Sequence, residues 1–170
     1  NHWALGLVLA SAMISAFAAT SAPSSAAMPL QALADKPGQI SIKGIGKVFY
    51  VPSTPDTIKW GYLPNATHVP VLTVPSGATV VFDTVSHEGI LEDQGRDPVK
   101  YFGAHGVPTR MVLKDAIAIT GSSLAHDFAK DGPHIVTGPV AIDGAEPGDV
   151  LMVDVLAVTP RVPYGVISNR

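Results

Sequence analysis

The sequence predicts a mainly β domain, a β-sandwich or barrel-like fold with one or two short helices. Short apolar stretches alternate with turns rich in glycine and proline, which number 16 and 15 among the 170 residues. Such a pattern is typical of short strands joined by tight connections. Apolar side chains also occupy both faces of the segment 150–158, interrupted only by Asp154. A strand of that kind is expected to be covered on both sides, as in a sandwich or a closed barrel.

Charge separates a leader from the rest of the chain. All 11 basic and 14 acidic residues lie from Asp35 onward. The net charge of −3 provides no basic stripe, which argues against nucleic acid as a partner. The sequence contains no cysteine, so disulfides, thiol nucleophiles and thiolate metal ligands are excluded.

The charge-free residues 1–34 are interpreted as a secretory signal peptide whose basic n-region is missing. Residues 3–19 form an apolar run rich in alanine, and small residues at 25–27 or 32–34 suit a signal peptidase. We therefore expect an exported protein, periplasmic or secreted, without stable membrane insertion after cleavage. A membrane anchor is the alternative, because about 17 apolar residues reach the lower limit for crossing a bilayer.

The first strands are expected after a linker. Residues 35–58 are interpreted as this linker together with an N-terminal strand at 47–51. The segment 69–74 carries Pro70, which places it at a sheet edge or at an entry to a sheet. A Pro-Ser-Gly turn then leads into a stronger strand at 79–85.

Helical spacing follows, and then two further strands. Apolar residues recur at helical intervals over 110–119, and further helical turns are expected over 123–130, before an Asp-Gly-Pro stop. Strands are expected at 135–142 and 150–158, because a loop full of turn-forming residues separates these two apolar stretches.

Histidines and carboxylates are the available chemical groups. Asp83 closes the strand at 79–85 and His87 follows in the next loop, where functional sites are usually built. His134 stands between a Gly-Pro pair and a strand. No His-Glu-x-x-His motif is present, and a solvated acidic loop with an ordinary surface histidine is an open alternative. Ser122 or Ser123 is interpreted as a helix cap.

Two segments resemble the acetamidase/formamidase family. The first is Thr137-Gly138-Pro139, a short strand, then Gly144-Ala145-Glu146-Pro147-Gly148-Asp149 and another strand; the second is the turn and strand at 74–84, which ends in Asp83-Thr84. The resemblance runs from about Trp60 to Arg170 and corresponds to the N-terminal half of the family. His87-Glu88-Gly89 departs from the family pattern, which indicates a divergent branch.

The resemblance implies a β-rich fold and the hydrolysis of small linear amides, such as formamide and acetamide, to a carboxylate and ammonia. It also implies a divalent metal, zinc, and a homo-oligomer in the full-length protein. Residues 59–170 would then form the N-terminal half of the β domain, truncated and therefore incomplete. A metal-bound hydroxide would attack the amide, and the metal would stabilise the oxyanion.

Site residues follow from the resemblance and from the residue types. Asp83 and His134 are expected to be catalytic, and Asp83, His87 and His134 are expected to bind the metal. Thr84 and Thr137 are expected to line the substrate. The alternative function, from a different class, is a non-catalytic extracytoplasmic β-sandwich module that binds a ligand or a metal.

Overall fold

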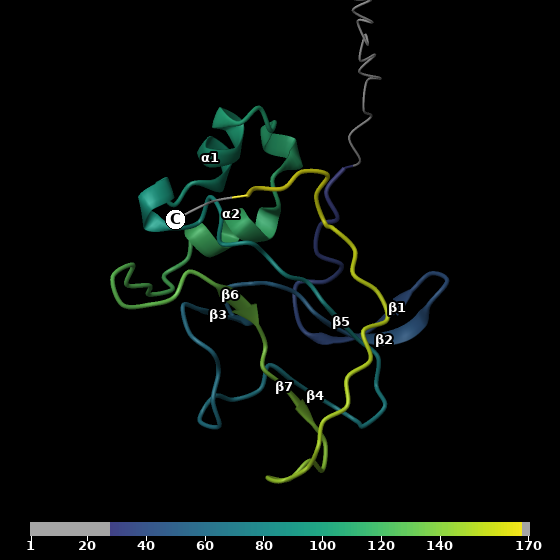
Figure 1. Ribbon diagram of the computed structural model, residues 1–170. Helices are drawn as coiled ribbons and strands as arrows, with labels where there is room; N and C mark the ends of the chain where they lie inside the picture. The colour runs from purple at the N-terminus through teal and green to yellow at the C-terminus, as the bar shows by residue number, and fades with distance from the viewer. Residues whose placement is uncertain (1–27, 168–170) are drawn as a thin grey trace, which may run out of the picture.

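The computed structural model describes residues 28–167 (Figure 1). Within this range the chain forms seven strands in three small sheets, together with two short α-helices and two 3-10 turns. The prediction of a mainly β domain with short helices is confirmed, and the described sheets do not close into a barrel. The expected signal peptide falls almost entirely outside the described residues. None of the helices described is long and apolar enough to cross a membrane.

The first sheet is a hairpin extended by a third strand. Strands β1 (Gly38–Ile42) and β2 (Gly46–Val51) pair antiparallel, and β5 (Val80–Phe82) pairs parallel with β2. The strand predicted at 47–51 is confirmed as β2, whereas the one predicted at 79–85 is reduced to three residues. Strand β5 ends one residue before Asp83, and the Asp83 N–H still donates to the Val51 carbonyl of β2 at 3.0 Å.

The other two sheets each join an early strand to a late one. Strand β3 (Ile58–Trp60) pairs antiparallel with β6 (Ile135–Thr137), and β4 (Leu72–Val74) pairs parallel with β7 (Val140–Ile142). The single strand expected at 135–142 is therefore wrong. Gly138 adopts a φ of 121° and is followed by a cis peptide bond to Pro139. Residues 135–137 pair with β3 and residues 140–142 with β4, so the two halves join different sheets.

Both helices lie between β5 and β6 in the sequence. Helix α1 (Pro98–Ala104) begins where the Asp97 side chain accepts a hydrogen bond from the Lys100 N–H, at 2.9 Å. The helix expected at 110–119 is divided into a 3-10 turn, η2 (Thr109–Met111), and α2 (Lys114–Thr120), because the backbone is extended between them. The helical turns expected at 123–130 are wrong, since only a turn at residues 128–130 is formed.

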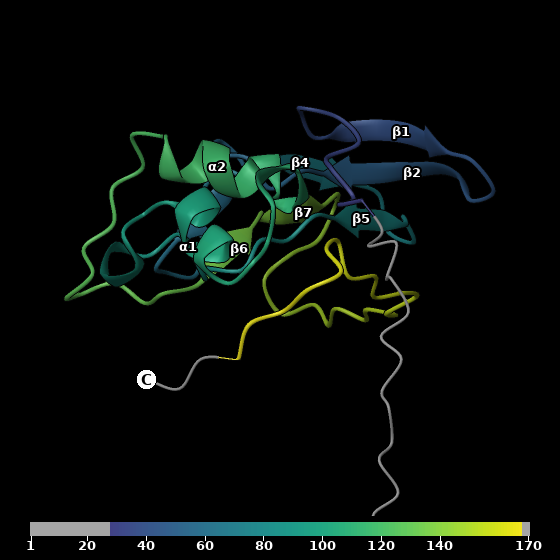
Figure 2. The same cartoon turned by 90° about the horizontal axis from the view of Figure 1, so that it is seen from above.

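An apolar core joins α2 to β3. Figure 2 shows α1 and α2 at one end of the molecule, and β1, β2 and β5 at the other. Trp60 is 2% exposed and Ile119 is fully buried. The cluster of buried core residues comprises Ile58, Trp60, Val85, Ile90, Leu91, Leu113, Ala116 and Ile119. Because Val85, Ile90 and Leu91 belong to it, the loop after β5 is anchored on both sides of His87 and Glu88.

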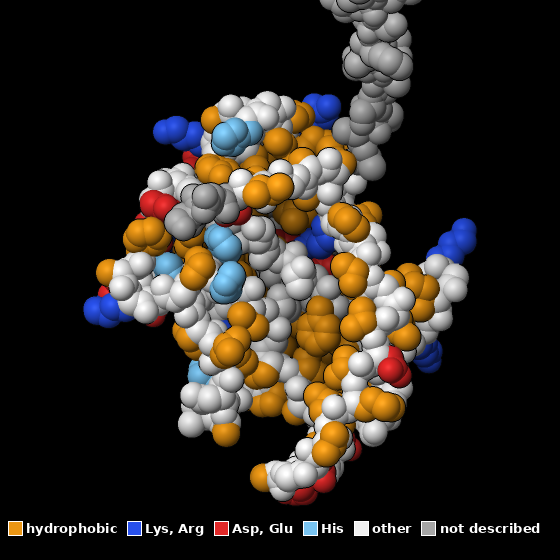
Figure 3. All heavy atoms as spheres, in the orientation of Figure 1, with side chains coloured by type: hydrophobic (Ala, Val, Ile, Leu, Met, Phe, Trp, Pro, Cys, Tyr) orange, Lys and Arg blue, Asp and Glu red, His pale blue; other side chains and the backbone are white. Residues whose placement is uncertain are grey.

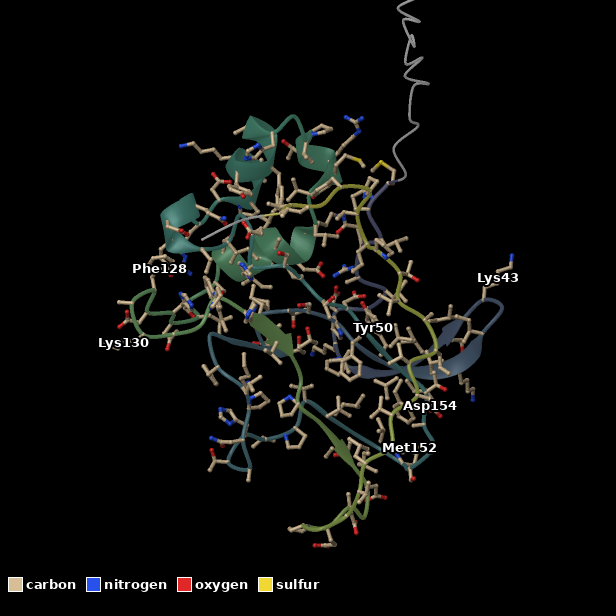
Figure 4. The ribbon with its side chains drawn as sticks, in the orientation of Figure 1. Lys43, Tyr50, Phe128, Lys130, Met152 and Asp154 are labelled. Atoms are coloured by element: carbon tan, nitrogen blue, oxygen red, sulfur yellow. The ribbon has the colours of Figure 1, made fainter. Side chains whose placement is uncertain are left out.

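The segment 150–158 does not form the strand expected from its sequence. Val150 is 95% exposed and Leu156 is 75% exposed, so the expectation of a segment covered on both faces is wrong. Among the described residues no neighbouring strand is bonded to it, and strand propensity without a partner does not build a sheet. Figure 3 shows hydrophobic side chains along this part of the surface, and Met152 and Asp154 on the segment are labelled in Figure 4.

Candidate functional site

Two of the predicted site residues, His87 and His134, lie side by side. Their ring centroids are 5.3 Å apart, and the ring planes meet at 69°, edge to face. His87 lies in the loop after β5, and His134 directly precedes β6. The backbone of His134 is fixed because its carbonyl accepts a hydrogen bond from the Gly61 N–H at 2.9 Å. We call these two residues the histidine pair.

A shallow hollow adjoins the histidine pair. It has a volume of about 150 Å³, and its lining residues are Gly61, Tyr62, Leu63, Gly132, His134 and Val136. The chain is tightly packed at its rim, because a Cβ on Gly61 would lie 2.5 Å from the Cβ of Asp131. A hollow of this size, with little polar surface besides His134, suits a very small molecule.

A buried carboxylate lies next to His87. Oε1 of Glu88 is 3.3 Å from Nε2 of His87, and the residue is only 5% exposed. Its other oxygen, Oε2, accepts hydrogen bonds from Nε2 of Gln94 at 2.5 Å and from the hydroxyl of Tyr101 at 3.1 Å. Sequence reasoning missed Glu88 as a site residue. A glutamate before the apolar Gly-Ile-Leu stretch does not by itself predict burial, and its partners Gln94 and Tyr101 come from other elements.

Asp83 belongs to a different cluster from the histidine pair. The Tyr50 hydroxyl donates a hydrogen bond to Oδ2 of Asp83, and Nη2 of Arg161 lies 3.3 Å from the same oxygen. Nη1 of Arg161 also contacts Oδ2 of Asp115 at 2.6 Å. The side chains of Arg161 and Asp115 are 10% and 6% exposed. We call these four residues the arginine cluster; Tyr50 is labelled in Figure 4.

Burial dominates the electrostatics of the arginine cluster. Desolvation raises the pKa of Asp83, although the hydrogen bond from Tyr50 and the charge of Arg161 both oppose it. Desolvation and the hydrogen bond to Asp83 also raise the pKa of Tyr50 above its usual value. A carboxylate held by a phenol and a guanidinium connects segments that are distant in the sequence.

The two predicted substrate-lining threonines lie beside the arginine cluster. The Thr137 hydroxyl donates to the Asp83 carbonyl at 2.8 Å, and Oγ of Ser53 lies 3.2 Å from the same hydroxyl. The Thr84 carbonyl lies 3.5 Å from Nη1 of Arg161. Thr137 therefore ties β6 to the loop after β5, a contact that supports the fold.

Residues 28–167 do not fit the zinc site that the resemblance implies. No three His, Asp or Glu side chains in this range come together in a group that could hold a metal ion. The histidine pair offers two imidazoles, while the carboxylate of Asp83 is engaged by Tyr50 and Arg161. Three protein ligands are usual for a catalytic zinc, and the two imidazoles alone fall short of that number.

His126, which the sequence did not single out, has a structural role. Its ring stacks on Trp60 at 4.3 Å, and its side chain is 0% exposed. Nδ1 lies 3.0 Å from both carboxylate oxygens of Glu92, and Nε2 lies 3.0 Å from the Gly132 carbonyl. Both ring nitrogens thus face acceptors inside the fold, and this side chain is not available to a ligand. The Ser122 hydroxyl donates to the Ile119 carbonyl at 2.6 Å at the C-terminal end of α2, and no helix follows among the described residues, so the cap predicted at Ser122 or Ser123 does not begin a helix.

Comparison of the chain with models of known families, with curated proteins and with solved structures finds no match. The resemblance to the acetamidase/formamidase family therefore stays a prediction from two sequence segments.

Proposed function

We propose that this chain supplies the acid–base groups of a hydrolase that cleaves small linear amides, such as formamide and acetamide, to a carboxylate and ammonia. The observation that carries the proposal is the histidine pair, in which His134 lines a small hollow and His87 lies beside the buried Glu88. The substrate class is inferred from the family resemblance, and the acid and base are the two imidazoles of the histidine pair.

Hydrolysis of an amide needs a base and an acid. One neutral imidazole of the pair takes a proton from water as the oxygen adds to the carbonyl carbon. The second imidazole, protonated, gives its proton to the amide nitrogen. The C–N bond then breaks and ammonia leaves with the electron pair of that bond. The carboxylic acid that remains gives its proton to the released ammonia and becomes the carboxylate. Two rings 5.3 Å apart are close enough to serve opposite ends of one small amide.

The size of the hollow supports a small substrate. About 150 Å³ beside His134 is enough for a molecule with three or four heavy atoms, and too little for a peptide segment. Gly61 and Gly132 approach closely, since the Gly132 N–H donates to the Gly61 carbonyl at 2.8 Å. Two glycines without side chains at this contact keep the hollow open next to His134.

Zinc is a separate part of the proposal, because it depends on the resemblance alone. The chemistry assigned to the histidine pair does not require it. If zinc takes part, ammonia release is lost after treatment with a chelator and is restored by added zinc. Release that is indifferent to chelation rejects the metal and leaves the acid–base proposal in place.

A second candidate function is a non-catalytic module that binds a ligand or a metal. The observation in its favour is that Tyr50 and Arg161 both contact the carboxylate of Asp83. The family resemblance implies a catalytic role for this residue. In such a module the fold is kept and no hydrolysis takes place.

Ammonia release from formamide and acetamide distinguishes the two functions. The assay uses the protein expressed from its complete reading frame, compared with His87→Gln and with His105→Gln as a control, because His105 is exposed. We expect release by the wild type and by the control, and a loss of about a hundredfold or more in His87→Gln. Absence of release by the wild type would support the binding module instead.

A further inference from the structure

The last residues of the charge-free leader contact the folded domain. Residues 28–34 fall within the predicted signal peptide, yet the Leu30 N–H donates to the Arg161 carbonyl at 2.7 Å. The Leu30 carbonyl accepts in turn from Nε of Arg161 at 2.9 Å, and the neighbouring Pro29 is buried. In Figure 1 the purple start of the described chain meets the yellow segment that carries Arg161. Two hydrogen bonds therefore join residues that are 131 positions apart in the sequence.

Gln31 and Leu33 extend these contacts. The Leu33 N–H donates to the Tyr50 hydroxyl at 2.9 Å. Oε1 of Gln31 accepts a hydrogen bond from the N–H of Lys114, the first residue of α2, at 3.1 Å. The N–H groups in the first turn of a helix have no acceptor inside the helix, and the N-cap residue Leu113 makes no side-chain hydrogen bond to them. Gln31 therefore provides the acceptor that the N-cap residue of α2 lacks.

The same segment completes the arginine cluster. Nε of Arg161, in a side chain only 10% exposed, donates to the Leu30 carbonyl. The Tyr50 hydroxyl accepts from the Leu33 N–H and donates to a carboxylate of the cluster. A buried donor that loses its acceptor destabilises the folded state. A chain that began at Asp35 would lack both contacts.

We propose that signal peptidase cleaves the chain between Ala27 and Met28, so that residues 28–34 are the first residues of the mature protein. This inference rests on the predicted signal peptide and is independent of the proposed hydrolase function. Ser25 and Ala27 provide the small side chains that the peptidase needs at the third and first positions before the cut. The site also lies closer to the apolar run than Ala34 does. A cut after Ala34 would remove every contact described above.

The new chain ends suit their positions at this bond. The oxygen of a water molecule joins the carbonyl carbon of Ala27, and the C–N bond breaks. The nitrogen of Met28 keeps the electron pair of that bond and takes both protons of the water, which leaves a carboxylate and an ammonium. Met28 is 60% exposed, so the ammonium is solvated. A charged terminus one residue later, on the buried Pro29, would be costly.

N-terminal sequencing of the exported protein tests the inference. The protein is expressed from its complete reading frame in a secreting bacterium, and we expect the mature chain to begin at Met28. In Ala27→Leu a large side chain stands directly before the cut, so the product that begins at Met28 should be lost. Ala34→Leu is the matched control, because it makes the same change at the other candidate site and should leave the N-terminus at Met28.

Three results would overturn the inference. The first is a mature chain that begins at Asp35 or at any residue other than Met28. The second is a leader that stays attached and holds the protein in the membrane fraction. The third is an Ala27→Leu product that still begins at Met28. None of these readouts depends on ammonia release, so the cleavage site and the hydrolase proposal stand or fail separately.

Discussion

Replacement of Arg161 by methionine is expected to destabilise the fold by about 3–5 kcal/mol, because it leaves two buried carboxylates without their cation. The guanidinium lies 2.6 Å from Asp115 and 3.3 Å from Asp83, and these carboxylate side chains are 6% and 13% exposed. Nε of Arg161 also donates to the Leu30 carbonyl at 2.9 Å. Methionine fills a similar volume, so the loss reports the charges rather than a cavity.

Urea denaturation at pH 7 measures this loss as a change in the free energy of unfolding. Arg110→Met is the matched control, because Arg110 is exposed, and it should change stability by less than about 0.5 kcal/mol. Adding Asp83→Asn and Asp115→Asn to Arg161→Met should recover most of the loss, since neutral amides are not penalised as charges are. A loss in Arg161→Met no larger than in the control would refute the account of the arginine cluster.

The same variant has a predicted pH dependence. Burial already raises the pKa of Asp83, and the charge of Arg161 opposes that rise, so removing Arg161 raises this pKa further. A carboxyl group with a higher pKa in the folded state contributes stability below its unfolded pKa, and this contribution is lost as the pH rises through the folded value. The defect of Arg161→Met should therefore be largest at pH 7 and shrink as the pH falls toward about 4. A defect that grows in acid would contradict this sign.

Three further predictions concern packing, and urea denaturation checks each. His126→Ala should cost about 2–4 kcal/mol, because it removes a buried ring with two polar contacts; a loss below about 1 kcal/mol would contradict a structural role. Gly89→Ala should cost about 1–3 kcal/mol more than Gly77→Ala, since both glycines have a φ of 79° but only Gly89 lacks space for a Cβ; equal losses would show that the loop yields. Leu156→Lys should change stability by less than about 0.5 kcal/mol, whereas Ile119→Ala should cost about 2–5 kcal/mol; comparable losses would mean that the segment 150–158 is covered.

Sequence patterns located the elements that depend on local signals. The turn before β5 and the hydrophobic strand β2 are local features, and both lie where the sequence predicted them. The start of α1 was also readable, because Asp97 followed by Pro98 is a common helix N-terminus. The signal for the start of α1 is therefore present in the sequence, although the helix was not predicted.

Features that depend on partners far away in the sequence could not be predicted. The segment 150–158 has the composition of a buried strand, but its exposure depends on whether another strand pairs with it. Asp83 was expected to be catalytic because it ends a strand. Its carboxylate instead contacts Tyr50, 33 residues earlier in the chain, and Arg161. The proximity of His87 and His134 was expected only through a shared metal. The structure shows the two rings side by side, where β6 lies against the loop after β5 through the hydrogen bond from the Thr137 hydroxyl to the Asp83 carbonyl.

The initial rate of ammonia release from formamide, in the wild type and in His134→Gln, tests the central claim most directly. The protein is expressed from its complete reading frame, and circular dichroism confirms that the variant is folded. If the histidine pair supplies the acid and the base, the wild type releases ammonia and the variant is slower by about a hundredfold or more. Equal rates in the two proteins would contradict the claim that the histidine pair carries out the chemistry.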